Sequence, residues 1–179
     1  MPNIIKRFNN PRIILVLGIL VLVNLALFSL PALAGSRPRI LASAPELAVP
    51  DMKGIYSPDY VYDFLTAIGP AGRHAFQMMH FTTDLVFPLL YGLLLFAVLC
   101  RLVSQQAGGN VHLPLLALLP VASDLTENFS LVMITAQYPA FHPRLTWLAQ
   151  GFTLLKFGGL LATLTVIVIL FSMSRKTVN

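Results

Sequence analysis

The chain of 179 residues has the length of one domain, but 56% of its residues are hydrophobic, 11% are charged and the mean hydropathy is +0.77. This composition excludes an ordinary soluble domain and is typical of a protein whose main solvent is lipid. The net charge of +5 comes from cations beside the apolar runs, which favours a role in membrane orientation over nucleic-acid binding. The single cysteine, Cys100, excludes an internal disulfide and a CxxC redox pair.

Four apolar runs are long enough to cross the bilayer core as helices, which takes about 20 residues each. We expect these spans at residues 13–34, 81–102, 113–136 and 145–172. Together they predict an all-α fold, an integral membrane four-helix bundle in contact with the lipid bilayer.

The first apolar run also resembles a cleavable signal peptide, because a basic segment precedes it and Ala32-Leu33-Ala34 follows it. Its apolar part, Ile13 to Leu30, is longer than a usual signal core of about 7 to 15 residues. We therefore favour an uncleaved span; cleavage would leave three spans.

The connections are expected to alternate between the two sides of the membrane. One side receives residues 1–12, 103–112 and 173–179, and the other receives 35–80 and 137–144. The first side holds a group of cations, in these segments or, for Arg101, at the adjoining end of the second span: Lys6, Arg7, Arg12, Arg101, Arg175 and Lys176. The positive-inside rule then predicts a multi-pass protein of the cell membrane with both termini in the cytoplasm.

The long external connection, 35–80, is expected to begin as irregular chain and then to form a short helix at the bilayer interface. Ser57 is a suitable N-cap and Pro58 suits the first helical position, so we expect this helix over 58–68. The GPAGR run at 69–73 is expected to form a turn into the second span.

Ionisable residues inside the expected spans are the most informative feature of the sequence. Three of the seven acidic residues and one lysine lie there: Asp84, Asp124, Glu127 and Lys156. A charge at the bilayer centre costs roughly 2.5 to 3.5 kcal/mol even on insertion scales, so such residues usually face the bundle interior and mark a functional site.

Helical spacing places these residues on three polar stripes. The stripe of the second span contains Gln77, His80, Asp84 and Tyr91. The stripe of the third span contains Asp124, Glu127, Asn128 and Thr135. The stripe of the fourth span contains Thr146, Gln150, Thr153 and Lys156. We expect the stripes to meet in one core that opens outward near Arg73, while the first span supplies an apolar wall.

Asp84, Asp124 and Glu127 are the candidate catalytic groups, as acids or bases, because three carboxylates facing one ammonium require a proton or a bound cation. The candidate ligand-binding residues are Arg73, His80, Tyr91, Asn128, Gln150, Thr153 and Lys156. A purely structural role is the alternative, since ion pairs and polar bridges also join helices in membrane bundles.

Pro88 lies four residues after Asp84 and lacks the amide that would bond the Asp84 carbonyl. We expect a kink there that leaves this carbonyl free. Neither a metal nor another cofactor is expected: His80, Asp84 and Glu127 form at most a partial ligand set without an HExxH or paired ExxH signature.

Through these residues the chain resembles an uncharacterised group of small bacterial four-span membrane proteins. The resemblance extends from about Tyr60 to Lys156 and includes the motifs GPAGR, DxxxPxxY, DxxEN and FTxxK. It implies a fold and a set of matching positions and brings no activity with it. A more distant likeness, in shape only, is to the four-span sterol-isomerase and sigma-2 receptor group, which also places carboxylates in a hydrophobic pocket.

The favoured hypothesis is an outward-opening acidic site within the membrane that binds a small hydrophobic or amphipathic molecule; whether the protein is an enzyme is left open. The first alternative is a non-catalytic subunit or assembly factor, whose stripes pack against partner membrane proteins or further copies of the chain. The second alternative is a proton-coupled transporter.

Overall fold

The computed structural model describes residues 2–106 and 108–176, and every regular element in that part of the chain is a helix. Three stretches are long and apolar enough to cross a membrane: Gly69–Ser104, Leu113–Ala136 and Pro143–Ser174. The predicted all-α class is confirmed, and these stretches indicate a membrane protein.

The first apolar helix is shorter than predicted. After α1 (Pro2–Phe8), Asn10 caps α2 (Pro11–Leu27), which ends well before residue 34. Pro31 explains the early end, because it lacks the amide that would bond the Leu27 carbonyl and it disfavours helical backbone in the residue before it. The 17 residues of α2 span about 26 Å, slightly less than the hydrocarbon thickness.

The connection 35–80 contains more helix than predicted. Its first half, expected to be irregular, includes two single-turn helices, α3 (Arg37–Ile40) and α4 (Pro50–Lys53). The expected short helix is present as α5 (Pro58–Ala67). The Ser57 hydroxyl caps it by accepting a hydrogen bond from the backbone amide of Tyr60, the third residue of the helix, at 3.1 Å.

The run at 69–73, predicted as a turn, is instead the first turn of α6 (Gly69–Phe81). Gly69, at φ +65°, turns the chain between α5 and α6, and Pro70 follows in the first turn of α6. A break at Thr82 separates α6 from α7 (Thr83–Ser104). The second apolar stretch therefore starts well before residue 81.

The remaining helices follow the predicted spans. The third predicted span corresponds to a short 3₁₀ helix, η1 (Leu113–Ala117), continued by α8 (Leu118–Ala136). The fourth lies within α9 (Pro143–Lys176). Pro114 and Pro120 lie in the first turns of η1 and α8, where a missing amide costs little.

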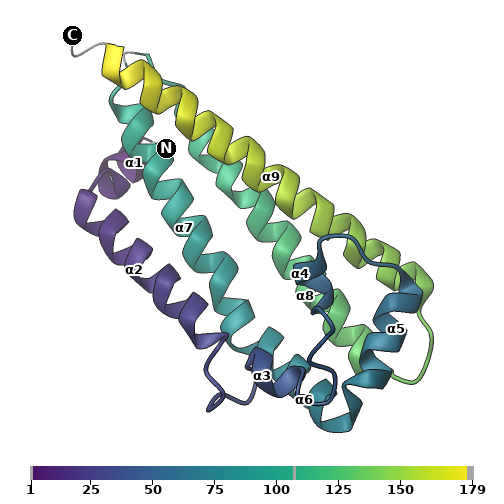
Figure 1. Cartoon of the computed structure of the whole chain (residues 1–179). Coiled ribbons are helices and arrows are strands. Elements are labelled where there is room, and N and C mark those ends of the chain that lie inside the picture. The colour runs from purple at the N-terminus through teal and green to yellow at the C-terminus, as the bar shows by residue number, and fades with distance from the viewer. Residues whose placement is uncertain (1, 107, 177–179) are drawn as a thin grey trace.

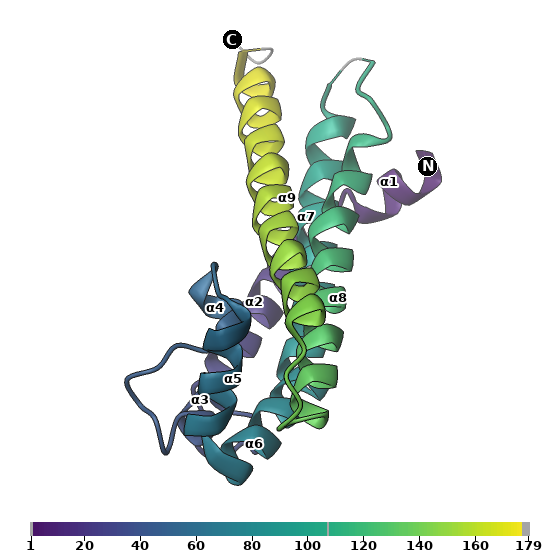
Figure 2. The same cartoon turned by 90° about the vertical axis from the view of Figure 1, so that its right-hand side faces the viewer.

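The long helices α2, α7, α8 and α9 run along the molecule, with α1 and the end of α9 at one end and α3, α5 and α6 at the other (Figure 1). The closest packing joins α8 to α9, and α2 packs along α7. Figure 2 shows the segment from α3 to α6 grouped together, with α4 beside α9.

The connection from α3 to α6 is a packed part of the structure. Phe64 of α5 and Phe76 of α6 are fully buried, and their ring centroids lie 5.4 Å apart. Gly35 allows the chain to approach α6 closely, because a Cβ there would lie 2.6 Å from Met79 Cα. This packing holds the segment around α4 against the long helices, where the polar residues lie.

Candidate functional site

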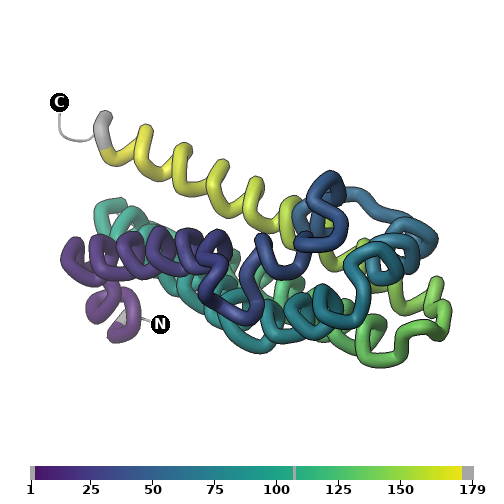
Figure 3. The backbone as a smooth tube through the Cα atoms, turned by 60° about the horizontal axis from the view of Figure 1, so that its bottom comes forward, coloured from purple at the N-terminus to yellow at the C-terminus, as the bar shows by residue number. Residues whose placement is uncertain are grey.

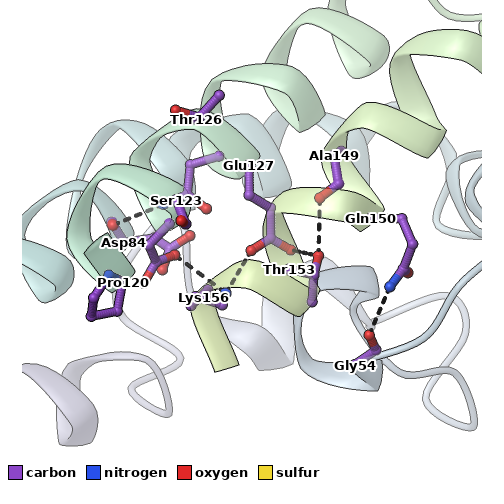
Figure 4. A network of polar contacts seen from close by, with 12 residues as sticks. Gly54, Asp84, Pro120, Ser123, Thr126, Glu127, Ala149, Gln150, Thr153 and Lys156 are labelled. Atoms are coloured by element: carbon purple, nitrogen blue, oxygen red, sulfur yellow. Dashed lines mark hydrogen bonds and ion pairs between the residues drawn. The ribbon is translucent and has the colours of Figure 1, made fainter. Parts of the chain in front are cut away.

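An ion cluster joins α8 to α9 (Figure 4). Lys156 Nζ lies 2.6 Å from Glu127 Oε2 and 3.3 Å from Asp124 Oδ1. All three side chains are buried, and the i, i+3 spacing of the two carboxylates puts both on the side of α8 that faces α9. One ammonium is thus shared by two carboxylates.

The second oxygen of each carboxylate has a hydroxyl partner. The Tyr91 hydroxyl lies 3.0 Å from Asp124 Oδ2, within donating distance, and Thr153 Oγ1 donates to Glu127 Oε1 at 2.5 Å. A buried ion pair is tolerated only when its remaining lone pairs are also bonded. The stripes of α7, α8 and α9 therefore meet in one network around Lys156.

A tyrosine from the connection extends this network. The Tyr56 hydroxyl lies 3.0 Å from Thr153 Oγ1 and 3.4 Å from Glu127 Oε1. Gln150 holds the segment in place: its Oε1 accepts from the Tyr56 amide at 2.7 Å, and its Nε2 donates to the Gly54 carbonyl at 3.0 Å. Burial raises the pKa of Tyr56, so its phenol stays protonated as a donor.

The role of Tyr56 is not predicted by the sequence, which indicates an external loop over residues 35–80. One signal was available. Gln150 and Thr153 continue the polar stripe of the fourth span beyond Lys156, and buried polar side chains of this kind require partners. Those partners come from the connection.

His80 and Asp84 form a second polar pair across the break at Thr82, with His80 Nδ1 2.7 Å from Asp84 Oδ2 and both side chains buried. Asn128 links this pair to α8, because its Nδ2 donates to the Asp84 carbonyl at 3.1 Å. That carbonyl is the one deprived of its helical donor by Pro88. Asn128 therefore supplies the hydrogen bond that the proline removes.

Replacing Asn128 with alanine is expected to destabilise the protein by about 1–3 kcal/mol, because the buried Asp84 carbonyl loses its partner. In a Pro88→Ala background the helix regains a backbone donor for this carbonyl, so the same replacement should cost clearly less. Thermal unfolding of the four variants in one detergent measures this coupling. Equal losses in both backgrounds would show that Asn128 stabilises the protein in another way.

Asp51 of α4 is a fourth buried carboxylate, and it lies in the connection 35–80, outside the three predicted polar stripes. It is 9% exposed, and its Oδ1 has no hydrogen-bond partner among the described residues. Burial, and secondarily the charge of Asp84, raises the pKa of Asp51 to about 6. The packing of the connection against the long helices brings this residue into the site.

A cavity of about 540 Å³ adjoins these groups. Its apolar lining includes Leu25, Phe28, Phe87, Phe157 and Leu160. Its polar lining includes Arg37, Asp51, Asp84, Tyr91, Asp124 and Lys156. As expected, the first apolar helix and its C-terminal end contribute mainly apolar wall, through Leu25 and Phe28.

Arg73, predicted to bind ligand at the mouth of the site, lies away from the network. Its Nη1 donates to the Leu65 carbonyl at 2.7 Å, and its guanidinium stacks 4.1 Å from the centre of the Tyr138 ring. The helical start of α6 directs this side chain to the end of α5 and the loop before α9. Its contacts fix the position of α5.

The fold and the site define a class: an all-helical membrane protein with a buried network of carboxylates, lysine and hydroxyls beside an apolar cavity. Within residues 2–106 and 108–176, no group of three His, Cys, Asp or Glu side chains is placed to hold a metal ion. Comparison with known proteins finds no matching family model, curated protein or solved structure.

Proposed function

We propose that the chain is a four-span protein of the cell membrane that binds a small hydrophobic or amphipathic molecule in the cavity beside Lys156. The observation that supports this is the combination of volume and lining. About 540 Å³ is within the range of small-molecule sites, roughly 300–1,000 Å³, which are largely apolar with a few convergent polar groups.

The proposed topology includes α2 as the fourth span. This mainly apolar helix of 17 residues lies along α7, and local thinning of the bilayer accommodates a helix of this length. The end of the molecule that carries α1 also carries a group of cations: Lys6, Arg7, Arg12 and Arg101. We therefore assign this end, with both termini, to the cytoplasm.

Within this proposal the carboxylates have different roles. Asp84 and Asp124 line the cavity and are placed to contact a ligand as acids, bases or cation-binding groups. Glu127 is fully buried behind them and acts by holding Lys156 and Thr153. Whether the bound molecule is also transformed depends on its chemistry.

The double variant Asp124→Asn/Glu127→Gln is expected to lose the bound molecule. Each amide keeps an acceptor oxygen for the surrounding donors, but the buried Lys156 ammonium loses both of its charged partners and the variant is expected to be less stable, so thermal unfolding first checks that it is folded. Native mass spectrometry of the gently solubilised protein, followed by solvent extraction and small-molecule analysis, then measures the loss of the molecule. A matched control is Glu46→Gln/Asp59→Asn, which removes two exposed carboxylates and should retain the molecule.

Retention of the molecule by the site variant would contradict the proposal. Protein partners at fixed stoichiometry with an empty cavity would instead favour the subunit or assembly-factor alternative. A pH-dependent flux in proteoliposomes, lost in the site variant, would favour the proton-coupled transporter.

A further inference from the structure

The cavity lies between two helices that do not pack closely on each other in the described part of the chain. α2 packs along α7 and α9 along α8, while the cavity is lined by Leu25 of α2 and by Lys156, Phe157 and Leu160 of α9. Figure 3 shows α2 and α9 apart along much of their length. Leu25 and Phe157, which line the cavity, are about half exposed, 45% and 46% respectively, so they lie at its open rim. In a bilayer these rim residues face acyl chains.

The polar end of the cavity contains an acceptor in need of a donor. Asp51 is buried and lines the cavity, and its Oδ1 has no partner among the described residues. A buried carboxylate oxygen without a hydrogen bond is costly, so it is retained most readily where something else supplies the donor. The neighbouring carboxylates already have donors of their own: Lys156 and Tyr91 at Asp124, and His80 at Asp84.

The charges around the cavity leave one negative charge in excess. Three carboxylates line the cavity: Asp51, Asp84 and Asp124. A fourth, Glu127, forms an ion pair with Lys156, which also lines the cavity. Three groups of opposite sign face them when His80 is protonated: Arg37, His80 and Lys156. With every carboxylate ionised, one further monovalent cation or one proton therefore neutralises the described residues.

We propose that the site takes an amphiphile with a single protonated amine, which enters from the bilayer between α2 and α9 and donates its ammonium hydrogens to Asp51. This inference rests on the proposed binding function and specifies its ligand class. The tail of the amphiphile lies along Leu25, Phe28, Phe157 and Leu160. An anionic head group would meet three lining carboxylates, Asp51, Asp84 and Asp124. Arg37 offers it a buried Nε without a hydrogen-bond partner among the described residues, but Arg37 also lines the more open hollow near Pro38, and its Nη2 donates to the Met52 sulfur.

Three probes that share one oleyl chain test the head group: oleylamine, oleyl alcohol and oleic acid. Binding to the full chain in lipid nanodiscs is measured at pH 7.5 by native mass spectrometry and thermal stabilisation. The amine is expected to bind at least about tenfold more tightly than the alcohol. A charge-assisted hydrogen bond stabilises a complex by roughly 1.4 kcal/mol more than a neutral one, and this difference corresponds to a tenfold change in affinity. Asp51→Asn should remove this preference and leave the affinity for the alcohol unchanged. The matched control Asp59→Asn, on an exposed residue, should keep the preference.

Equal affinities for the amine and the alcohol, a preference for the acid, or an amine preference that survives in Asp51→Asn would each overturn the amine assignment while leaving a lipid-binding cavity in place. Binding of none of the three probes would overturn both this inference and the proposed function.

The route of entry is tested by placing a larger side chain at Leu25, at the edge of the cavity. Leu25→Trp is expected to slow the association of oleylamine relative to Leu20→Trp, which adds the same side chain at another exposed position of α2. Equal association rates would overturn the lateral route.

Discussion

Replacement of Lys156 by methionine is expected to lower the free energy of unfolding by about 3–5 kcal/mol, the cost of leaving a buried charge without its partner. Methionine occupies a similar volume and is compatible with the apolar part of the site. It removes the ammonium that lies 2.6 Å from Glu127 and 3.3 Å from Asp124. Two carboxylates would then face each other's charge with hydroxyl donors as their remaining partners among the described residues.

Thermal unfolding in one detergent, compared with Lys6→Met on an exposed lysine of α1, measures the effect. The triple variant Lys156→Met/Asp124→Asn/Glu127→Gln should recover most of the loss, since all three charges are then removed together. If Lys156→Met costs as much in the neutral background as in the original protein, the loss arises from packing and the charge-based explanation is wrong.

The pH dependence of stability is expected to change by about 3 kcal/mol on removal of the Asp51 carboxylate. The pKa of Asp51 is raised from 3.8 to about 6 in the folded protein, so folding favours the protonated form. The protonated Asp51 therefore contributes fully to the free energy of unfolding below pH 4. This contribution falls by about 1.4 kcal/mol for each pH unit between 3.8 and about 6, and it is lost above that range.

Asp51→Asn mimics the protonated side chain at every pH. Its advantage over the original protein should be near zero at pH 4 and approach about 3 kcal/mol at pH 7, when measured without added ligand. Asp59→Asn, on the exposed face of α5, should show no such trend. A flat difference between Asp51→Asn and the original protein from pH 4 to pH 7 would show that Asp51 is well solvated.

These two variants separate two kinds of buried charge in one site. Lys156 has partners within the protein, so its removal destabilises the fold. Asp51 lacks a partner at one oxygen among the described residues, so its neutralisation is expected to stabilise the fold and weaken the binding of a cation. Stability lost at a binding group is a common cost of function.

Local patterns in the sequence were sufficient for the long helices of the third and fourth predicted spans and for the network of Asp124, Glu127, Thr153 and Lys156. Hydropathy over about 20 residues predicted the third and fourth spans, because the bilayer imposes a fixed length. The helical period placed Asp124 and Glu127 on one face and Lys156 with Thr153 on another, because these relations depend only on residues within two turns. The N-cap at Ser57 was also predicted from its neighbours.

The ends of the helices were predicted less well. The first apolar helix stops at Leu27 because of Pro31, although the hydropathy continues beyond it. The helix at Gly69 begins where a turn was expected, because a single glycine with positive φ is enough to turn the chain. In both cases the backbone preference of a single proline or glycine decides where the helix ends or begins, and a pattern averaged over many residues does not reveal it.

Only the tertiary structure decided which parts of the long connection belong to the site. Tyr56 meets Gln150 and Thr153 across 94 and 97 residues of sequence, and Asp51 reaches the cavity in the same way, while Arg73 is directed away from it. No helical period relates residues in a connection to residues in a span. Their positions follow from how α3 to α6 pack against the long helices, and that packing depends on the shapes of surfaces that come together only when the chain has folded.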